Sequence, residues 1–120
     1  MNVETLRDYC LEKPFVEEGF PFGSETLVFK VGGKMFLLIS LDSEDFRFNV
    51  KCHPDRIEQL RADFDCVQPG FHQNKKHWNT IVPDGSVSNK QLQQWIDESY
   101  ELVFDGLSKK KRDSLTNSLL

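Results

Sequence analysis

The stretch GFHQNKKHWNT, residues 70–80, holds the most varied chemistry in this sequence and contains no carboxylate. Its imidazole, ammonium and indole groups belong to His72, His77, Lys75, Lys76 and Trp78. Such groups can bind a metal ion, transfer a proton, or contact phosphates and stack on bases. The rest of the chain must decide which of these three kinds of chemistry the stretch serves.

The spacing of the potential metal ligands does not indicate a metal site. Structural zinc sites use pairs of cysteine and histidine at short, fixed spacings, whereas Cys52, His53, Cys66, His72 and His77 match no such pattern. A second candidate is an acidic ridge formed by Glu4, Asp8, Glu12, Glu17 and Glu18. Carboxylates four apart on a helix usually form a solvated face. We therefore expect no metal ion and no other cofactor.

Catalytic signatures are also missing from the sequence. It contains no G-x-S-x-G, no P-loop, no H-E-x-x-H and no G-x-G-x-x-G. A cysteine and a histidine could form a nucleophilic pair only if the fold brought them together, which spacing alone does not indicate. We expect that the chain is not an enzyme.

If the protein binds nucleic acid, we expect the contact to be confined to a local part of its surface. A net charge of −4 speaks against a surface built throughout for phosphate. The longest interval without an acid runs from Asp65 to Asp84 and includes residues 70–80. Lysine and asparagine can bond to phosphates and base edges, although Trp78 is more typical of a core and the lysines of a solvated turn.

The size and composition predict a single globular domain spanning residues 1–120. The chain has 120 residues, of which 38% are hydrophobic, and ten phenylalanines. Its first residues lack the features of a signal peptide, and no apolar run is long enough to cross a membrane. The three cysteines are widely spaced, which favours buried, reduced thiols over disulfides. We expect a soluble, cytoplasmic protein.

The first half of the chain predicts a helix followed by strands. Residues 2–12 have helical spacing after the capping residue Asn2, and residues 13–25 resemble an ordered loop rich in proline, glycine and phenylalanine. Gly32 and Gly33 lie between two β-rich runs, which predicts a hairpin. Residues 46–51 alternate strictly and place Lys51 on a polar sheet face.

The second half predicts a short helix, two short strands and two more helices. The first helix covers residues 55–62, and the strands lie in CVQPG and HWNTIVP, with GFHQNKK as the turn or wing between them. If Trp78 and Thr80 point to the core, His77 and Asn79 join the polar face. A capping box at 88–91 opens a long amphipathic helix that ends at Gly106, and a final helix is expected over 109–118.

A series of short motifs occurs in order along the chain. They are YC at 9–10, KP at 13–14, PFG at 21–23, GGKMF at 32–36, NVK at 49–51, LR at 60–61, PGFHQNKKHWNT at 69–80, SY at 99–100 and LSKKKR at 107–112. In this combination the sequence resembles the MmcQ/YjbR family over nearly its whole length. It departs from the family pattern at Phe15 and in DSEDFR, whose Asp42, Glu44 and Asp45 we expect near Lys51.

The resemblance implies an α+β fold of two layers, called double-wing and similar to the frataxin-like (CyaY-like) domain. The helices at 2–12 and 88–106 then pack on one face of an antiparallel sheet of about five strands. It also implies a DNA-binding-like function, but a shared fold does not determine function.

Together these observations predict a non-enzymatic DNA-binding module with a local contact surface. The predicted contact residues are Lys51, His72, Asn74, Lys75, Lys76, His77 and Asn79. The lysines are expected to meet phosphates, and the asparagines to form polar bonds. One alternative is a protein-interaction or regulatory domain without nucleic-acid affinity, and another is a frataxin-like metal carrier using Glu4, Asp8 and Glu12. No membrane partner is expected, and the sequence does not indicate an oligomeric state.

Overall fold

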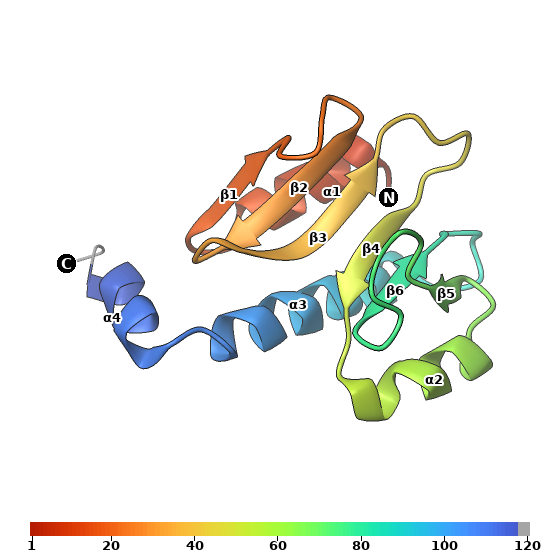
Figure 1. Cartoon of the computed structure of the whole chain (residues 1–120). Helices are drawn as coiled ribbons and strands as arrows, with labels where there is room; N and C mark the ends of the chain where they lie inside the picture. The colour runs from red at the N-terminus through yellow and green to blue at the C-terminus, as the bar shows by residue number, and fades with distance from the viewer. Residues whose placement is uncertain (118–120) are drawn as a thin grey trace.

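The computed structural model describes residues 1–117 and consists of helices and one antiparallel sheet (Figure 1). The elements in chain order are α1 (Val3–Leu11), β1 (Val16–Gly19), β2 (Thr26–Val31), β3 (Lys34–Ser40), β4 (Phe48–Lys51), α2 (Pro54–Asp63), β5 (Val67–Pro69), β6 (Trp78–Ile81), α3 (Asn89–Asp105) and α4 (Lys109–Asn117). Ser118, the last residue of the predicted final helix, lies outside the described residues.

The helices begin where the sequence places capping residues. The Asn2 side chain accepts a hydrogen bond from the Thr5 amide at 2.9 Å, and the Thr5 hydroxyl accepts one from the Asn2 amide, which completes a capping box for α1. Ser88 accepts from the Gln91 amide at 3.1 Å at the start of α3. These caps satisfy backbone N–H groups that have no partner inside the first turn.

The sheet has six strands in the order β1-β2-β3-β4-β6-β5, and every neighbouring pair is antiparallel. The predicted hairpin between β2 and β3 is confirmed, with Gly32 and Gly33 at φ values of 58° and 81°. Positive φ at both positions suits a two-residue turn whose twist matches the strands.

Helices cover one face of the sheet, as the family resemblance implies. In Figure 1, α1 and α3 lie behind the strands, and α3 packs against β3 and β4. The main hydrophobic core lies between these layers, and its largest fully buried side chains include Phe29, Phe36 and Phe48. The opposite face, which we call the open face, is turned toward the viewer in Figure 1. The α+β prediction with both terminal helices on one face is therefore confirmed.

The expectation of about five strands missed β1. Residues 16–19 were predicted as part of a loop, but they form an edge strand that pairs with β2, with Val16 opposite Val31. Glu18 lies on the helix side and binds Arg7 of α1, with Nη2 2.6 Å from Oε1. The ion pair lowers the pKa of Glu18 below its usual value. An exposed carboxylate on the inner face of an edge strand is thus tied to a helix.

The three cysteines are free and buried, as predicted. Burial raises the pKa of each thiol, to about 12 for Cys10, so none is held as a reactive thiolate. Within residues 1–117, no helix has both the length and the apolar character that crossing a membrane requires.

Candidate nucleic-acid interface

Residues 70–77, here called the 70–77 loop, join β5 to β6 and fold across the open face in front of β4 and β6 (Figure 1). The Phe71 amide donates to the Thr80 hydroxyl oxygen at 2.8 Å, and that hydroxyl donates to Asn49 Oδ1 of β4. Thr80 and Asn49 are direct partners in the register of β6 and β4. The loop is therefore anchored to side chains of the sheet face beneath it.

The return of the loop into β6 is built around Asn74. Its side-chain Oδ1 accepts from the Lys76 amide at 2.8 Å, and its carbonyl accepts from the Trp78 amide at 2.9 Å. An asparagine that bonds to the backbone two residues later is a standard way of closing a turn. Asn74, predicted as a contact residue, thus uses its side-chain oxygen to shape the loop.

Arg61 of α2 holds the end of the loop and the start of β6. Its Nε donates to Asn79 Oδ1 at 2.7 Å, and its Nη2 donates to the carbonyls of Trp78, at 3.2 Å, and Lys75. Arginine suits this task because its rigid fork presents several donors at once. The sequence reasoning missed this role, although Arg61 belongs to the LR motif at 60–61.

The side chains of β6 point to the opposite faces of the sheet from those predicted. Asn79 pairs with Val50 and lies on the helix side, where it is 1% exposed. It was predicted as a surface contact residue, and this placement is wrong because its amide is used to bind Arg61 inside the molecule. Trp78 and Thr80 lie instead on the open face.

Trp78 is buried on the open face, not in the main core. It packs with Val28 and Leu38 in a small second cluster and is 7% exposed. Gly70 allows the loop to lie on it, because a Cβ at this glycine would come within 2.8 Å of Trp78 Cβ and of its carbonyl oxygen. Trp78 is therefore a packing residue, as predicted. The sequence did not indicate that it packs on the open face.

The remaining predicted contact residues come together on one side of the molecule. His72, Asn74, Lys75 and Lys76 are exposed, and His77 is half-buried. Lys75 Nζ donates to the Gly70 carbonyl at 3.1 Å across the loop. Lys51 is the direct partner of Trp78 in the register of β4 and β6, which places it on the open face.

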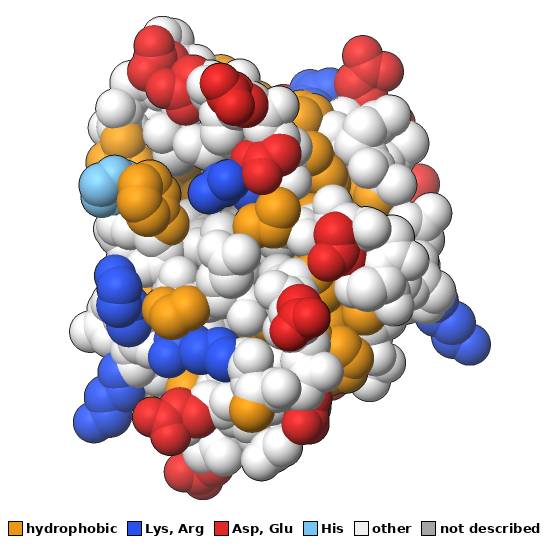
Figure 2. Space-filling model, turned by 90° about the vertical axis from the view of Figure 1, so that its right-hand side faces the viewer, with side chains coloured by type: hydrophobic (Ala, Val, Ile, Leu, Met, Phe, Trp, Pro, Cys, Tyr) orange, Lys and Arg blue, Asp and Glu red, His pale blue; other side chains and the backbone are white. Residues whose placement is uncertain are grey.

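The acidic insertion before β4 does not lie beside Lys51. β4 runs from Phe48 to Lys51, so residues 41–47 enter it at the far end from that lysine. Asp45 pairs with Arg47 at 2.6 Å, which lowers the pKa of the carboxyl group. Figure 2 shows several lysine and arginine side chains on its left flank and others elsewhere, with acidic side chains gathered at the top, across the face and below the basic group. The expected neutralisation of Lys51 by these carboxylates is therefore wrong.

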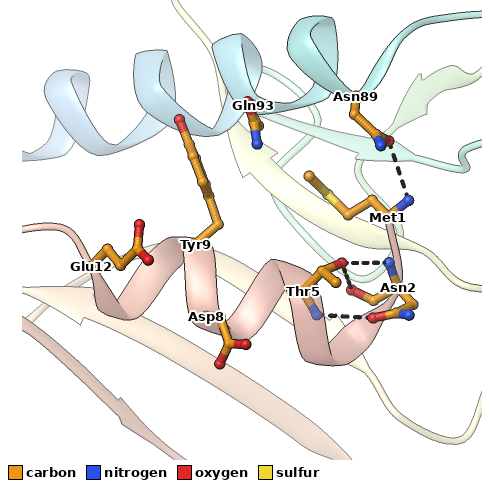
Figure 3. A pocket seen from close by; sticks show the side chains of 8 residues that line it. All are labelled: Met1, Asn2, Thr5, Asp8, Tyr9, Glu12, Asn89 and Gln93. Carbon is orange, nitrogen blue, oxygen red and sulfur yellow. Dashed lines mark hydrogen bonds between the residues drawn. The ribbon is translucent and has the colours of Figure 1, made fainter.

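The acidic residues of the metal-carrier alternative do not converge. Asp8 and Glu12 line a hollow of about 320 Å³ between α1 and the start of α3. In Figure 3, Tyr9 reaches toward α3 while Asp8 points away from it. Burial, and then a hydrogen bond to Asp97, raise the pKa of Tyr9 to about 12. Among residues 1–117, no three histidine, cysteine or acidic residues lie together as a metal-binding group.

Comparison with known protein families gives one match over most of the chain. The YjbR family model aligns with residues 11–102. The chain belongs to the YjbR family.

The relatives extend this assignment along nearly the whole chain. Protein YbdF of Escherichia coli O157:H7 is 42% identical over 89% of this chain and 88% of its own length, and YjbR of E. coli K12 is 30% identical over 96% and 98%. Both names describe uncharacterized proteins, so family membership carries no activity with it.

Solved structures support the same fold. A crystal structure of a Deinococcus radiodurans protein with the DUF419 domain is 40% identical, with a TM-score of 0.88 over 96% of this chain and 88% of that one. A Pseudomonas syringae crystal structure has a TM-score of 0.74 at 23% identity and covers 86% of this chain and 99% of its own. The second match speaks to the fold alone.

Proposed function

We propose that this YjbR-family chain is a non-enzymatic DNA-binding module that contacts phosphates with Lys76, Lys75 and Lys51. The observation that carries the proposal is the anchored 70–77 loop, which presents exposed lysines inside a stretch without carboxylates between Asp65 and Asp84. Phosphate neutralisation by lysine dominates DNA affinity, and a loop that is already ordered loses little conformational freedom on binding.

The asparagines take a different part from the one first expected. Asn74 and Asn79 shape and support the loop, through Lys76 N and Arg61 respectively. The contact surface then consists of lysines and histidines held from below. Because such a surface contacts phosphates and not base edges, the proposed binding to duplex DNA is independent of sequence.

A salt titration of duplex binding tests the proposal. With about two or three phosphate contacts, the logarithm of affinity should fall against the logarithm of salt concentration with a slope of about −2 to −3. Lys76→Ala should reduce that slope by about 1. Lys90→Ala, an exposed lysine at the start of α3, is the matched control and should leave the slope unchanged.

Two results would contradict the proposal. One is the absence of DNA binding at low salt by the intact chain, to duplex and single strand alike. The other is an equal effect of Lys76→Ala and Lys90→Ala, which would mean that the 70–77 loop has no special part in the contact.

A further inference from the structure

A hollow lies on the open face between the 70–77 loop and the loop that precedes β2. Its volume is about 360 Å³. It is lined by Phe22, Thr26, Leu38, His72 and Gln73. This volume falls within the usual range of small-molecule sites, about 300–1,000 Å³.

One exposed aromatic ring, that of Phe22, lines the hollow, and a second, that of Phe71, lies against the lining residue His72. Phe22 is 63% exposed, and Phe71, next to His72, is 57% exposed. The rings of Phe71 and His72 lie with their centroids 4.0 Å apart. Exposed apolar groups that lie together often mark an interaction site, and nucleic-acid bases stack on the flat faces of aromatic rings.

The hollow also has a polar lining residue and a backbone in an unfavourable conformation. Gln73 is half-buried and lines the hollow. Its side-chain amide makes no hydrogen bond to another side chain of residues 1–117. His72 has a left-handed φ of 58°, which is unfavourable for a residue with a Cβ and turns the chain at the rim of the hollow. An amide offers both a donor and an acceptor, which the edge of a base can satisfy.

We propose that this hollow receives one unpaired base of single-stranded DNA, stacked between Phe22 and the Phe71–His72 pair. The inference rests on the proposed DNA-binding function and adds the form of DNA that is preferred. Leu38 forms the floor of the hollow. Gln73 and Thr26 contact the edge of the base. Lys75 and Lys76, from the 70–77 loop, bind the adjoining phosphates.

The observations favour a single strand over the other occupants of such a face. In a duplex the bases are stacked and paired, so none can enter the hollow without being flipped out. A protein partner would bring no phosphates for the exposed lysines of the 70–77 loop. A strand with free bases uses both the aromatic rings and the lysines, as other single-strand binders do.

Fluorescence anisotropy with labelled strands of about 12 nucleotides tests the inference. Three probes of equal length are compared at low salt: a single strand, the corresponding duplex, and an abasic strand that keeps the phosphates. The intact chain should bind the single strand more tightly than either of the others. Phe22→Ala should weaken single-strand binding by at least about fivefold and leave abasic-strand binding unchanged.

Phe20→Ala is the matched control. Phe20 is also exposed, at 51%, and belongs to the same connecting segment, but it lines another hollow together with Glu17 and Glu18. This variant should bind the single strand as the unmodified chain does. Circular dichroism checks that both variants are folded.

Each outcome decides between the two proposals. Binding of the duplex and abasic strands as tightly as the single strand, or an equal loss in Phe22→Ala and Phe20→Ala, overturns the base-binding hollow and leaves DNA binding in place. Absence of binding to all three probes overturns both.

Discussion

At the scale of single residues, the polar stretch at residues 70–80 contains side chains that support the structure of the 70–77 loop and side chains that face solvent. Asn79 is 1% exposed and bonds to Arg61 Nε at 2.7 Å, whereas Lys76 is exposed. Arg61 serves the stretch from another element by bonding to the carbonyls of Lys75 and Trp78. The arrangement of the loop therefore depends on one side chain that lies outside it.

Replacing Arg61 by alanine should destabilise the protein and loosen the loop. The change removes the guanidinium partner of a buried amide and two carbonyls, and we expect a loss of about 2 kcal/mol in the free energy of unfolding. Chemical denaturation measures that loss, and hydrogen exchange should show faster exchange of the Lys76 and Trp78 amides.

Arg56→Ala is the control for this change. Arg56 is an exposed arginine of the same helix, and its ion pair with Glu98 is 3.6 Å long. Removing an exposed ion pair costs at most about 1 kcal/mol. If both variants lost equal stability with no change in exchange at residues 76–78, Arg61 would not have the anchoring role that its contacts indicate.

At the scale of elements, patterns with a single physical meaning predicted the structure well. Gly32-Gly33 predicted the hairpin, and Asn2 and Ser88 marked the starts of α1 and α3. Each works through local chemistry, either positive φ or a side chain that accepts from a free backbone N–H. Elements defined this way do not depend on distant residues.

Elements whose surroundings come from distant residues could not be predicted in this way. Residues 16–19, which form β1, were predicted as part of an ordered loop because proline, glycine and phenylalanine surround them. The sequence does not show that Arg7 binds Glu18 on the inner side of this segment. In β6 all four residues are buried, one side by the 70–77 loop and the other by α2 and the core. With both sides covered, alternation no longer tells the inner face from the outer one.

The candidate site was predictable to the same degree. Lys75, Lys76 and His72 were expected at a turn and lie exposed in one, since an acid-free polar run between two strands has few other places to go. The hollow beside them was not foreseen, because Phe22 and His72 are far apart in the sequence. Only the fold brings the two loops together.

The contact between the 70–77 loop and β6 gives a prediction about these elements. Gly70→Ala places a Cβ 2.8 Å from Trp78 Cβ and from the Trp78 carbonyl oxygen, so the loop must lift from the strand. Crowding of this kind costs about 1–3 kcal/mol. Thermal unfolding should show the loss, and tryptophan fluorescence should shift to longer wavelength as Trp78 meets water.

Gly19→Ala is the matched glycine control, because no heavy atom lies within 4 Å of its added Cβ and its φ is not positive. It should lose no stability and leave the fluorescence unchanged. An unshifted spectrum in Gly70→Ala would show that the loop does not need close contact with Trp78.

At the scale of the whole molecule, α3 joins two parts of the sheet that separate at one end. The ladder between β3 and β4 runs from Ile39–Phe48 to Leu37–Val50, and beyond it Phe36 and Lys51 are not paired with each other. Ser99 of α3, which is fully buried, forms hydrogen bonds to the backbone of both strands at this point. Its hydroxyl donates to the Phe36 carbonyl at 2.6 Å and accepts from the Lys51 amide at 2.8 Å.

This bridge connects the hairpin half of the sheet to the half that carries the 70–77 loop, so its loss should be felt on both sides. Ser99→Ala keeps the size of the side chain nearly unchanged but leaves one carbonyl and one amide without a partner. We expect a loss of about 2 kcal/mol or more in the free energy of unfolding. Hydrogen exchange should accelerate at the Lys51 amide first, because that amide loses the Ser99 hydroxyl oxygen as its acceptor. Ser24→Ala, in an exposed loop, should change neither quantity. If Ser99→Ala kept full stability with a protected Lys51 amide, the ladder of β3 and β4 would be holding the two halves without help from α3.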